Sequence, residues 1–81
     1  MNVESIESGD ILNCIDCDPW SYITIDKEYV VIDKWYNIVS DHVHGYVRII
    51  DDDNYINSHP INFFESISEK RNRIINEILK V

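Results

Sequence analysis

The stretch EYVVIDKWYNIVSDHVHGYVRIIDDDNYI, residues 28–56, decides the fold of this chain. Residues 29–32 are β-branched or aromatic throughout and predict a strand that can continue as far as residue 36. Residues 42–50 end in a regular alternation, so one side of this second strand should face a core while the other is at least partly wet. The polar run at residues 51–54 lies between two apolar segments and indicates a tight hairpin turn. Together these signals predict an antiparallel sheet.

Short strands are expected on both sides of this stretch. Upstream, residues 11–15 form an apolar run in which Leu12 and Cys14 should share one face. The sequence Asp-Cys-Asp-Pro at residues 16–19 ends that strand, because proline cannot donate to a strand ladder. Downstream, Tyr55 and Ile56 begin a last short strand, which His59-Pro60 ends.

The C-terminal segment changes from a strand period to a helical one. Ser66 and Glu69 have the spacing of a capping box, which predicts a helix over about residues 66–80. Apolar side chains recur along it in one stripe, which we expect to pack on the sheet or on a partner. The stripe consists of Ile67, Ile74, Ile75, Ile78 and Leu79.

The length of 81 residues predicts a single domain over residues 1–81, with β-structure over residues 8–64 and the helix over residues 66–80. Four to five short antiparallel strands with one C-terminal α-helix are typical of a mainly β protein, built as a small, strongly bent sheet or barrel. The apolar content of 44% suffices for one compact core. We expect this core to include Tyr29, one of the two adjacent phenylalanines and one tryptophan.

The strand pattern resembles that of small SH3-like barrel proteins common in bacteriophage genomes. Those proteins share a Gly-Asp-apolar-x-Cys-Ile strand, a Leu-Thr-x-x-Lys-x-Tyr-x-Val strand, a strand that ends in an Asp-rich turn, and a closing aromatic residue. The matching positions, within about residues 8–64, are Gly9, Asp10, Cys14, Ile15, Thr24, Lys27, Tyr29, Val31, Asp51, Asp52 and Phe63 or Phe64. Asp26 departs from the pattern, which usually has glycine before the lysine, and the terminal helix lies outside it. The resemblance implies an SH3-like barrel and a viral origin, and it implies no activity.

Acidic residues are concentrated in the body of the chain. Residues 1–62 contain twelve Asp and Glu but three Lys and Arg, a net charge of −9, whereas residues 63–81 carry four basic and three acidic residues, a net charge of +1. Such a body repels nucleic acid and anionic lipid and attracts basic surfaces. No segment resembles a signal peptide or reaches the roughly 18 apolar residues of a membrane span. We therefore expect a cytoplasmic protein, in the host bacterial cytoplasm if it is viral, that binds neither nucleic acid directly nor membrane.

Metal and catalytic sites are poorly supported by the sequence. Cys14 and Cys17, with His42 and His44, offer four ligands of the types that bind zinc, but their spacings match zinc sites poorly and a buried Cys14 is the stronger interpretation. The Asp51–Asn54 run lacks the glycine and the distal glutamate of a calcium loop. No local signature places a base beside a nucleophilic Ser or Cys. We expect no metal, no cofactor and no catalytic activity, and the four possible zinc ligands stay an open alternative.

The aromatic residues next to acids are the stronger candidates for function. Rings within a charged rim are typical of protein interfaces, although the rings could equally serve to cover a thin barrel. We hypothesise an acidic protein-binding module that inhibits or modulates a host nucleic-acid-binding protein by occupying its basic surface. Carboxylates on a curved sheet can approximate a row of phosphates, so this binding could be DNA mimicry. The candidate partner-binding residues are Asp16, Asp18, Asp33, Trp35, Tyr36, Asp51, Asp52, Asp53 and Tyr55.

A structural or assembly module is the alternative function. The terminal helix would dock into a larger complex, or form a homodimer, through its apolar stripe. The opposing interpretation is that the stripe covers an open end of the barrel, which is common in so small a domain. The sequence therefore leaves both a monomer and a homodimer open.

Overall fold

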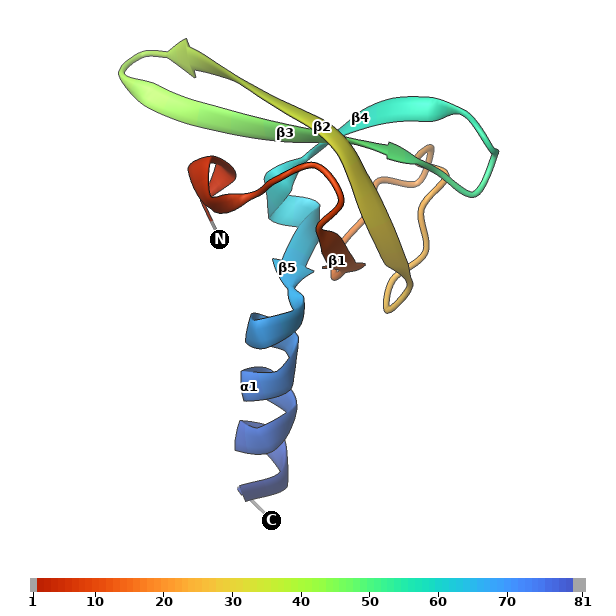
Figure 1. Ribbon diagram of the computed structural model, residues 1–81, viewed down its shortest axis with the longest axis vertical. Coiled ribbons are helices and arrows are strands. Elements are labelled where there is room, and N and C mark those ends of the chain that lie inside the picture. The colour runs from red at the N-terminus through yellow and green to blue at the C-terminus, as the bar shows by residue number, and fades with distance from the viewer. Residues whose placement is uncertain (1, 80–81) are drawn as a thin grey trace.

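A computed structural model describes residues 2–79 as one open antiparallel sheet with a C-terminal helix (Figure 1). The strand order is β4-β3-β2-β1-β5, and every pairing is antiparallel. The elements are η1 (Val3–Ser5), β1 (Ile11–Cys14), β2 (Glu28–Val39), β3 (His42–Ile50), β4 (Ile56–Pro60), η2 (Ile61–Phe63), β5 (Phe64–Ser66) and α1 (Ile67–Leu79). The prediction of a mainly β protein with a C-terminal helix is confirmed, in the form of a bent sheet that does not close.

The long strand β2 connects the two halves of the sheet. Its first residues pair with β1, and from Val31 onward it pairs with β3. The register shifts between Val31 and Asp33, where a bulge lets the strand bend. Beyond the bulge, β2 and β3 form a hairpin that ends at Ser40 and Asp41, which both have positive φ. Positive φ at two central residues gives a tight turn whose twist matches that of the strands.

Alternate residues of the central strands form the core. Val31, Val47 and Ile49 are buried, as are Leu12 and Cys14 on the same face of β1, so the predicted alternation is confirmed. On β2 and β3, successive side chains point to opposite faces, which is why Val31, Val47 and Ile49 reach the interior and their neighbours do not. In β1 the residue between Leu12 and Cys14, Asn13, is buried as well, on the other face, where it donates to Glu65.

Two predicted aromatic residues occupy the core, and the third does not. Tyr29 packs edge-to-face on Phe64, with ring centroids 6.3 Å apart. The prediction of a buried tryptophan is wrong, because Trp20 is 79% and Trp35 40% exposed. Trp35 lies on the outer face of the sheet and stacks on Tyr46, with centroids 4.1 Å apart. Trp35 pairs with Tyr46, and the buried residue of that part of β3 is the next one, Val47, so strand alternation directs Trp35 outward.

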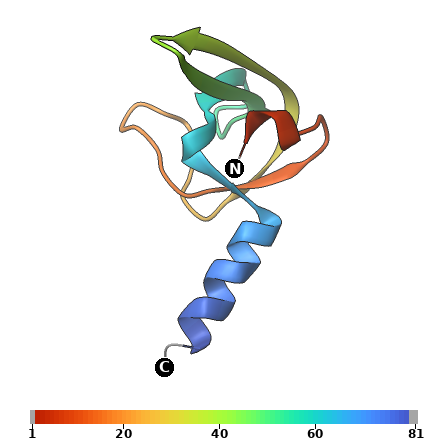
Figure 2. The same ribbon diagram turned by 90° about the vertical axis from the view of Figure 1, so that its left-hand side faces the viewer.

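The helix α1 leaves the sheet and does not fold back over it (Figures 1 and 2). The capping box is confirmed, since the Ser66 hydroxyl accepts from the Glu69 amide and the Glu69 carboxylate accepts from the Ser66 amide. Arg73 donates two hydrogen bonds to the buried carboxylate of Glu65, which also accepts from Asn13, so the helix is tied to β5 and β1. The predicted end of the helix at Lys80 lies outside the described residues.

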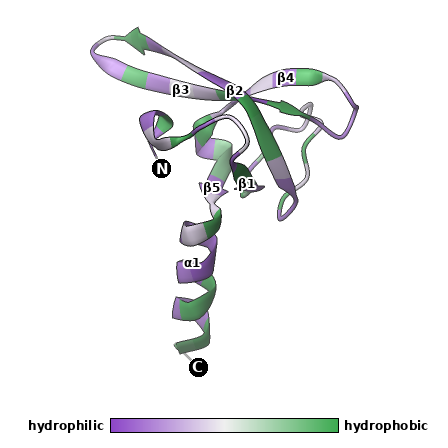
Figure 3. Cartoon of the chain, in the orientation of Figure 1, coloured by the Kyte–Doolittle hydropathy of each residue, from purple (hydrophilic) through white to green (hydrophobic). Residues whose placement is uncertain are grey.

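The apolar stripe of α1 is not covered by the sheet. No residue of Ile67–Leu79 is buried, and apolar residues recur along the distal half of the helix (Figure 3). Ile67 is partly buried beside β1, but the other four residues of the stripe are exposed, so the prediction that the stripe packs on the sheet is wrong for them. The reason is geometric: β5 directs the chain away from the sheet, and the Glu65–Arg73 contact holds only the proximal turns.

The N-terminal turn η1 lies against β3 at Gly45. A Cβ atom added at Gly45 would lie 2.8 Å from the Cβ atom of Val3, which is closer than real Cβ contacts. Val3 is itself part of the core. The absence of a side chain at Gly45 therefore lets the N-terminal segment pack under the β2–β3 hairpin.

We expect Gly45→Ala to lower the free energy of unfolding by about 1–3 kcal/mol, because overpacking forces the N-terminal segment to shift. Urea unfolding followed by tryptophan fluorescence measures the change. In a Val3→Gly background the same substitution should cost less, since the contacting Cβ atom is gone. An equal cost in both backgrounds would contradict the proposed contact.

Candidate protein-interaction site

Two segments far apart in the sequence meet at one end of the sheet. The amide of Asp52, in the β3–β4 turn, donates to the carbonyl of Tyr22, in the β1–β2 loop, at 2.7 Å. Figure 1 shows that loop running beside the turn. Six of the nine predicted site residues belong to this region. We call it the acidic end, and define it as Asp16, Asp18, Trp20, Tyr22, Asp51, Asp52, Asp53 and Tyr55.

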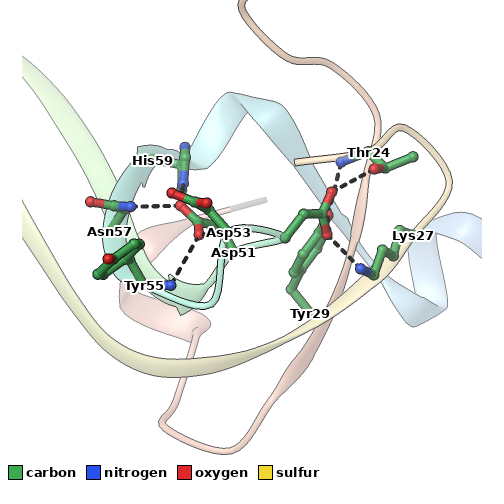
Figure 4. A network of polar contacts seen from close by, with 9 residues as sticks. Thr24, Lys27, Tyr29, Asp51, Asp53, Tyr55, Asn57 and His59 are labelled. Atoms are coloured by element: carbon green, nitrogen blue, oxygen red, sulfur yellow. Dashed lines mark hydrogen bonds and ion pairs between the residues drawn. The ribbon is translucent and has the colours of Figure 1, made fainter. Parts of the chain in front are cut away.

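Asp51 is a buried part of the turn. Its Oδ1 atom accepts from the amides of Asp53 and Tyr55 at 3.2 and 3.3 Å, and its Oδ2 atom accepts from the Asn57 side chain at 2.6 Å (Figure 4). The residue is 5% exposed. The prediction that Asp51 lies on an exposed turn tip is therefore wrong, because the backbone amides of a tight turn need an internal acceptor. Partner binding through this carboxylate stays a prediction.

Asp52 is also engaged within the chain. Its carboxylate accepts from the hydroxyls of Thr24 at 2.6 Å and Tyr29 at 2.9 Å, and it forms an ion pair with Lys27 (Figure 4). The hydrogen bonds from Lys27 and Thr24 hold the pKa of the Asp52 carboxyl below its ordinary value, and the contact raises the pKa of Lys27. Much of the charge on Asp52 is thus compensated before any partner arrives.

The remaining acids of this region are exposed. Asp16, Asp18 and Asp53 lie at the surface, each in the loop or the turn. They are accompanied by exposed rings of Trp20 and Tyr22, neither of which was among the predicted site residues. The signal that could have found Trp20 was its position two residues after Asp18. Exposed carboxylates and exposed rings therefore occur together here, as the interface hypothesis requires.

A cleft of about 330 Å³ opens between the loop and β4. Its lining includes the rings of Trp20, Tyr22 and Phe63 and the side chains of Asp18 and His59. The floor also contains Asp51 and Asn57 from the turn network. Loop, strand and 3₁₀ turn thus contribute to one concave surface.

His59 is a buried polar side chain of the cleft, and one of its ring nitrogens is unpaired. Its side chain is 8% exposed, and its Nε2 atom lies 3.9 Å from Asp51 Oδ2, beyond hydrogen-bond distance. Within residues 2–79 this nitrogen has no hydrogen-bond partner. Burial lowers the pKa of the His59 imidazole, while the carboxylates of Asp51 and Asp18 act in the opposite direction. The lowered pKa favours the neutral form of the imidazole.

Three predicted site residues lie outside the acidic end. Asp33 and Trp35 are on the β2–β3 hairpin, where Trp35 pairs with Tyr46 and donates from its indole nitrogen to Ser58. Tyr36 follows Trp35 on β2, and both residues line a cavity of about 520 Å³, away from the acidic end, together with Val3, Glu4 and Lys34. The nine predicted residues therefore do not form one continuous surface.

The four possible zinc ligands are not brought together. Cys14 is in the core, where burial raises the pKa of its thiol, whereas His42 and His44 pair with Val39 and Asn37 in the hairpin. In the part of the chain that the structure describes, no three His, Cys, Asp or Glu side chains are grouped as a metal ion would require. Over the same residues, no helix has the length and apolar character needed to cross a membrane.

Comparisons with protein-family models, with curated proteins and with solved structures found no match to this chain. The resemblance to phage-encoded SH3-like barrels therefore stays a prediction.

We expect Asp51→Ala to lower the free energy of unfolding by about 2–3 kcal/mol, because two backbone amides and the Asn57 amide lose their acceptor. Asp53→Ala, in the same turn but exposed, is the matched control and should change stability by no more than about 0.5 kcal/mol. Urea unfolding of both variants checks this. Similar losses for both would show that Asp51 does not organise the turn.

Proposed function

We propose that this protein is a non-catalytic, acidic protein-binding module whose acidic end engages a basic surface on a partner protein. The observation that carries the proposal is the exposure of Asp16, Asp18 and Asp53 beside the rings of Trp20 and Tyr22. Carboxylates form strong, charge-assisted hydrogen bonds with Arg and Lys, and aromatic rings add apolar area and attract cations. This combination favours a basic protein over nucleic acid or lipid.

The resemblance to phage-encoded proteins makes a bacterial host protein the expected partner. A basic surface on such a protein is commonly a nucleic-acid-binding surface, so occupying it would inhibit or modulate nucleic-acid binding. The exposed carboxylates come from a loop and a turn and not from alternate positions of a strand. DNA mimicry by this protein would consequently rest on charge and not on a regular spacing of phosphates. The protein would act in the host cytoplasm.

A pull-down with matched variants tests this function. The triple variant Asp16→Asn, Asp18→Asn, Asp53→Asn removes three exposed charges from the acidic end. The control variant Glu7→Gln, Asp33→Asn, Asp41→Asn removes three exposed charges elsewhere, so its net charge is the same. From a bacterial lysate, the tagged native chain and the control should enrich the same basic, nucleic-acid-binding protein, identified by mass spectrometry, and the site variant should lose it.

The bound protein should also be released when the salt concentration rises to about 0.5 M, since screening weakens exposed charge pairs. Competition between DNA and the tagged chain for the purified partner would then establish inhibition. Equal capture by the native chain and the site variant, or enrichment of proteins without a basic surface, would contradict the proposal.

A second candidate function, an assembly module, is favoured by the exposed stripe of α1. Its side chains at Ile74, Ile75, Ile78 and Leu79 are 40–76% exposed on a helix that stands apart from the sheet. Helices of this length are marginal in water without packing, so a covering surface is expected. The residues of α1 carry a net charge of +1 against −9 for residues 1–62, which makes the acidic body of a second copy a complementary partner.

If α1 docks on a second copy, light scattering at high concentration should report a dimer. Ile75→Glu with Ile78→Glu should then give a monomer, because charges replace the apolar stripe. Asn72→Glu with Asn76→Glu adds the same charge to exposed polar positions of α1 and should leave the dimer intact. A monomeric native chain would remove the self-assembly function.

A further inference from the structure

We propose that the cleft of the acidic end binds one arginine side chain of the partner protein. The guanidinium group would lie against the rings of Trp20 and Tyr22 and would be held by the carboxylate of Asp18, above the floor formed by Asp51 and His59. This site deepens the protein-binding function proposed above and rests on it. It specifies which chemical group of a basic partner is recognised, and where.

The size and shape of the cleft suit a single side chain. Its volume of about 330 Å³ is at the lower end of the range for ligand pockets. Three elements form its walls: the β1–β2 loop with Trp20 and Tyr22, strand β4 with His59, and η2 with Phe63. A flexible stem can enter along the apolar rings while its polar head reaches the floor.

The electrostatics of the cleft select a cation. Two carboxylates, Asp18 and Asp51, are part of the lining, and among the described residues that line the cleft there is no Lys or Arg. Ring faces carry partial negative charge, so Trp20 and Tyr22 act in the same direction as the carboxylates. An anionic ligand would meet repulsion from both sets of groups.

The unpaired nitrogen of His59 distinguishes arginine from other cations. In this site the proton of the neutral imidazole is assigned to Nδ1. Nε2 is then an acceptor, 3.9 Å from the Oδ2 acceptor of Asp51. Two buried acceptors at this separation can be satisfied by a group that has several donors. Guanidinium has five N–H donors, no acceptor and a planar face that stacks on aromatic rings, whereas ammonium is compact and more strongly hydrated.

The exposure of Trp20 agrees with this assignment. The ring contributes to the wall of the cleft but is 79% exposed, so the core does not account for its position. A large aromatic ring that is exposed beside a carboxylate buries its apolar surface only when a ligand or a partner covers it. A stacked guanidinium would provide that cover.

The test is an NMR titration of the full chain with N-acetyl-arginine methylamide. Shifts should be centred on the backbone amides of residues 18–22 and 57–59. The lysine analogue should bind at least about threefold more weakly, and the neutral citrulline analogue at least about tenfold more weakly, because the charge is absent.

Variants separate the cleft from general attraction to the acidic surface. Asp18→Asn should weaken the affinity for the arginine analogue about threefold to tenfold, and Trp20→Ala by a similar factor. Asp33→Asn makes the same change of charge on the hairpin and should leave the affinity unchanged. Both site positions are exposed, so the variants should fold, which their NMR spectra will verify.

Three results would overturn the proposal. The arginine analogue could bind no more tightly than the citrulline analogue, or no more tightly than the lysine analogue, or the NMR shifts could be spread over the whole surface. If the Trp20→Ala variant still captured the basic partner, the arginine site would be refuted, while the protein-binding function would stand. Binding of the arginine analogue to a chain that captures no basic protein would support the cleft and refute the function.

Discussion

The buried carboxylate of Asp51 is the interaction on which the acidic end depends. It gathers the amides of Asp53 and Tyr55 and the side chain of Asn57, which fixes the path of the β3–β4 turn. That path in turn places Asp52 where it reaches Thr24, Lys27 and Tyr29 across the sheet. The long β1–β2 loop is anchored by these contacts, and with it the rings of the cleft. A buried polar group is stable only when it is satisfied, so the turn, the loop and the cleft are mutually dependent.

The acids of this chain have two distinct uses. Asp51, Asp52 and Glu65 are acceptors within the fold: the first organises a turn, the second anchors a loop, and the third holds α1 to the sheet. Asp16, Asp18 and others remain exposed and give the surface its negative potential. The net charge of −8 does not separate these roles. What separates them is whether unsatisfied backbone amides and cations of the chain lie within reach of each carboxylate.

The two candidate surfaces are in different parts of the molecule. The acidic end is built by the β1–β2 loop and the β3–β4 turn, whereas α1 extends from β5 away from the sheet (Figure 1). Both surfaces can be used together if α1 docks on a part of the second copy's acidic body that lies outside the acidic end. In a dimer formed through α1, two acidic ends would act together, and linked sites bind more tightly than either alone. The protein-binding and assembly functions are therefore compatible.

The sequence by itself determined the local structure. The alternation at Val47 and Ile49, the capping box of Ser66 and Glu69, and the polar turn before Tyr55 each depend on neighbours in the chain, so their patterns predicted the elements correctly. Only the tertiary structure decided which residues meet. It buried Asp51, left Trp20 and Trp35 outside the core, and brought Asp18 and His59 into the lining of one cleft. The physical reason is that the exposure of a side chain and its partners depend on the paths of segments distant in the sequence. Those paths follow the bend of β2 and the exit of α1 from β5, which are set by packing that no local pattern contains.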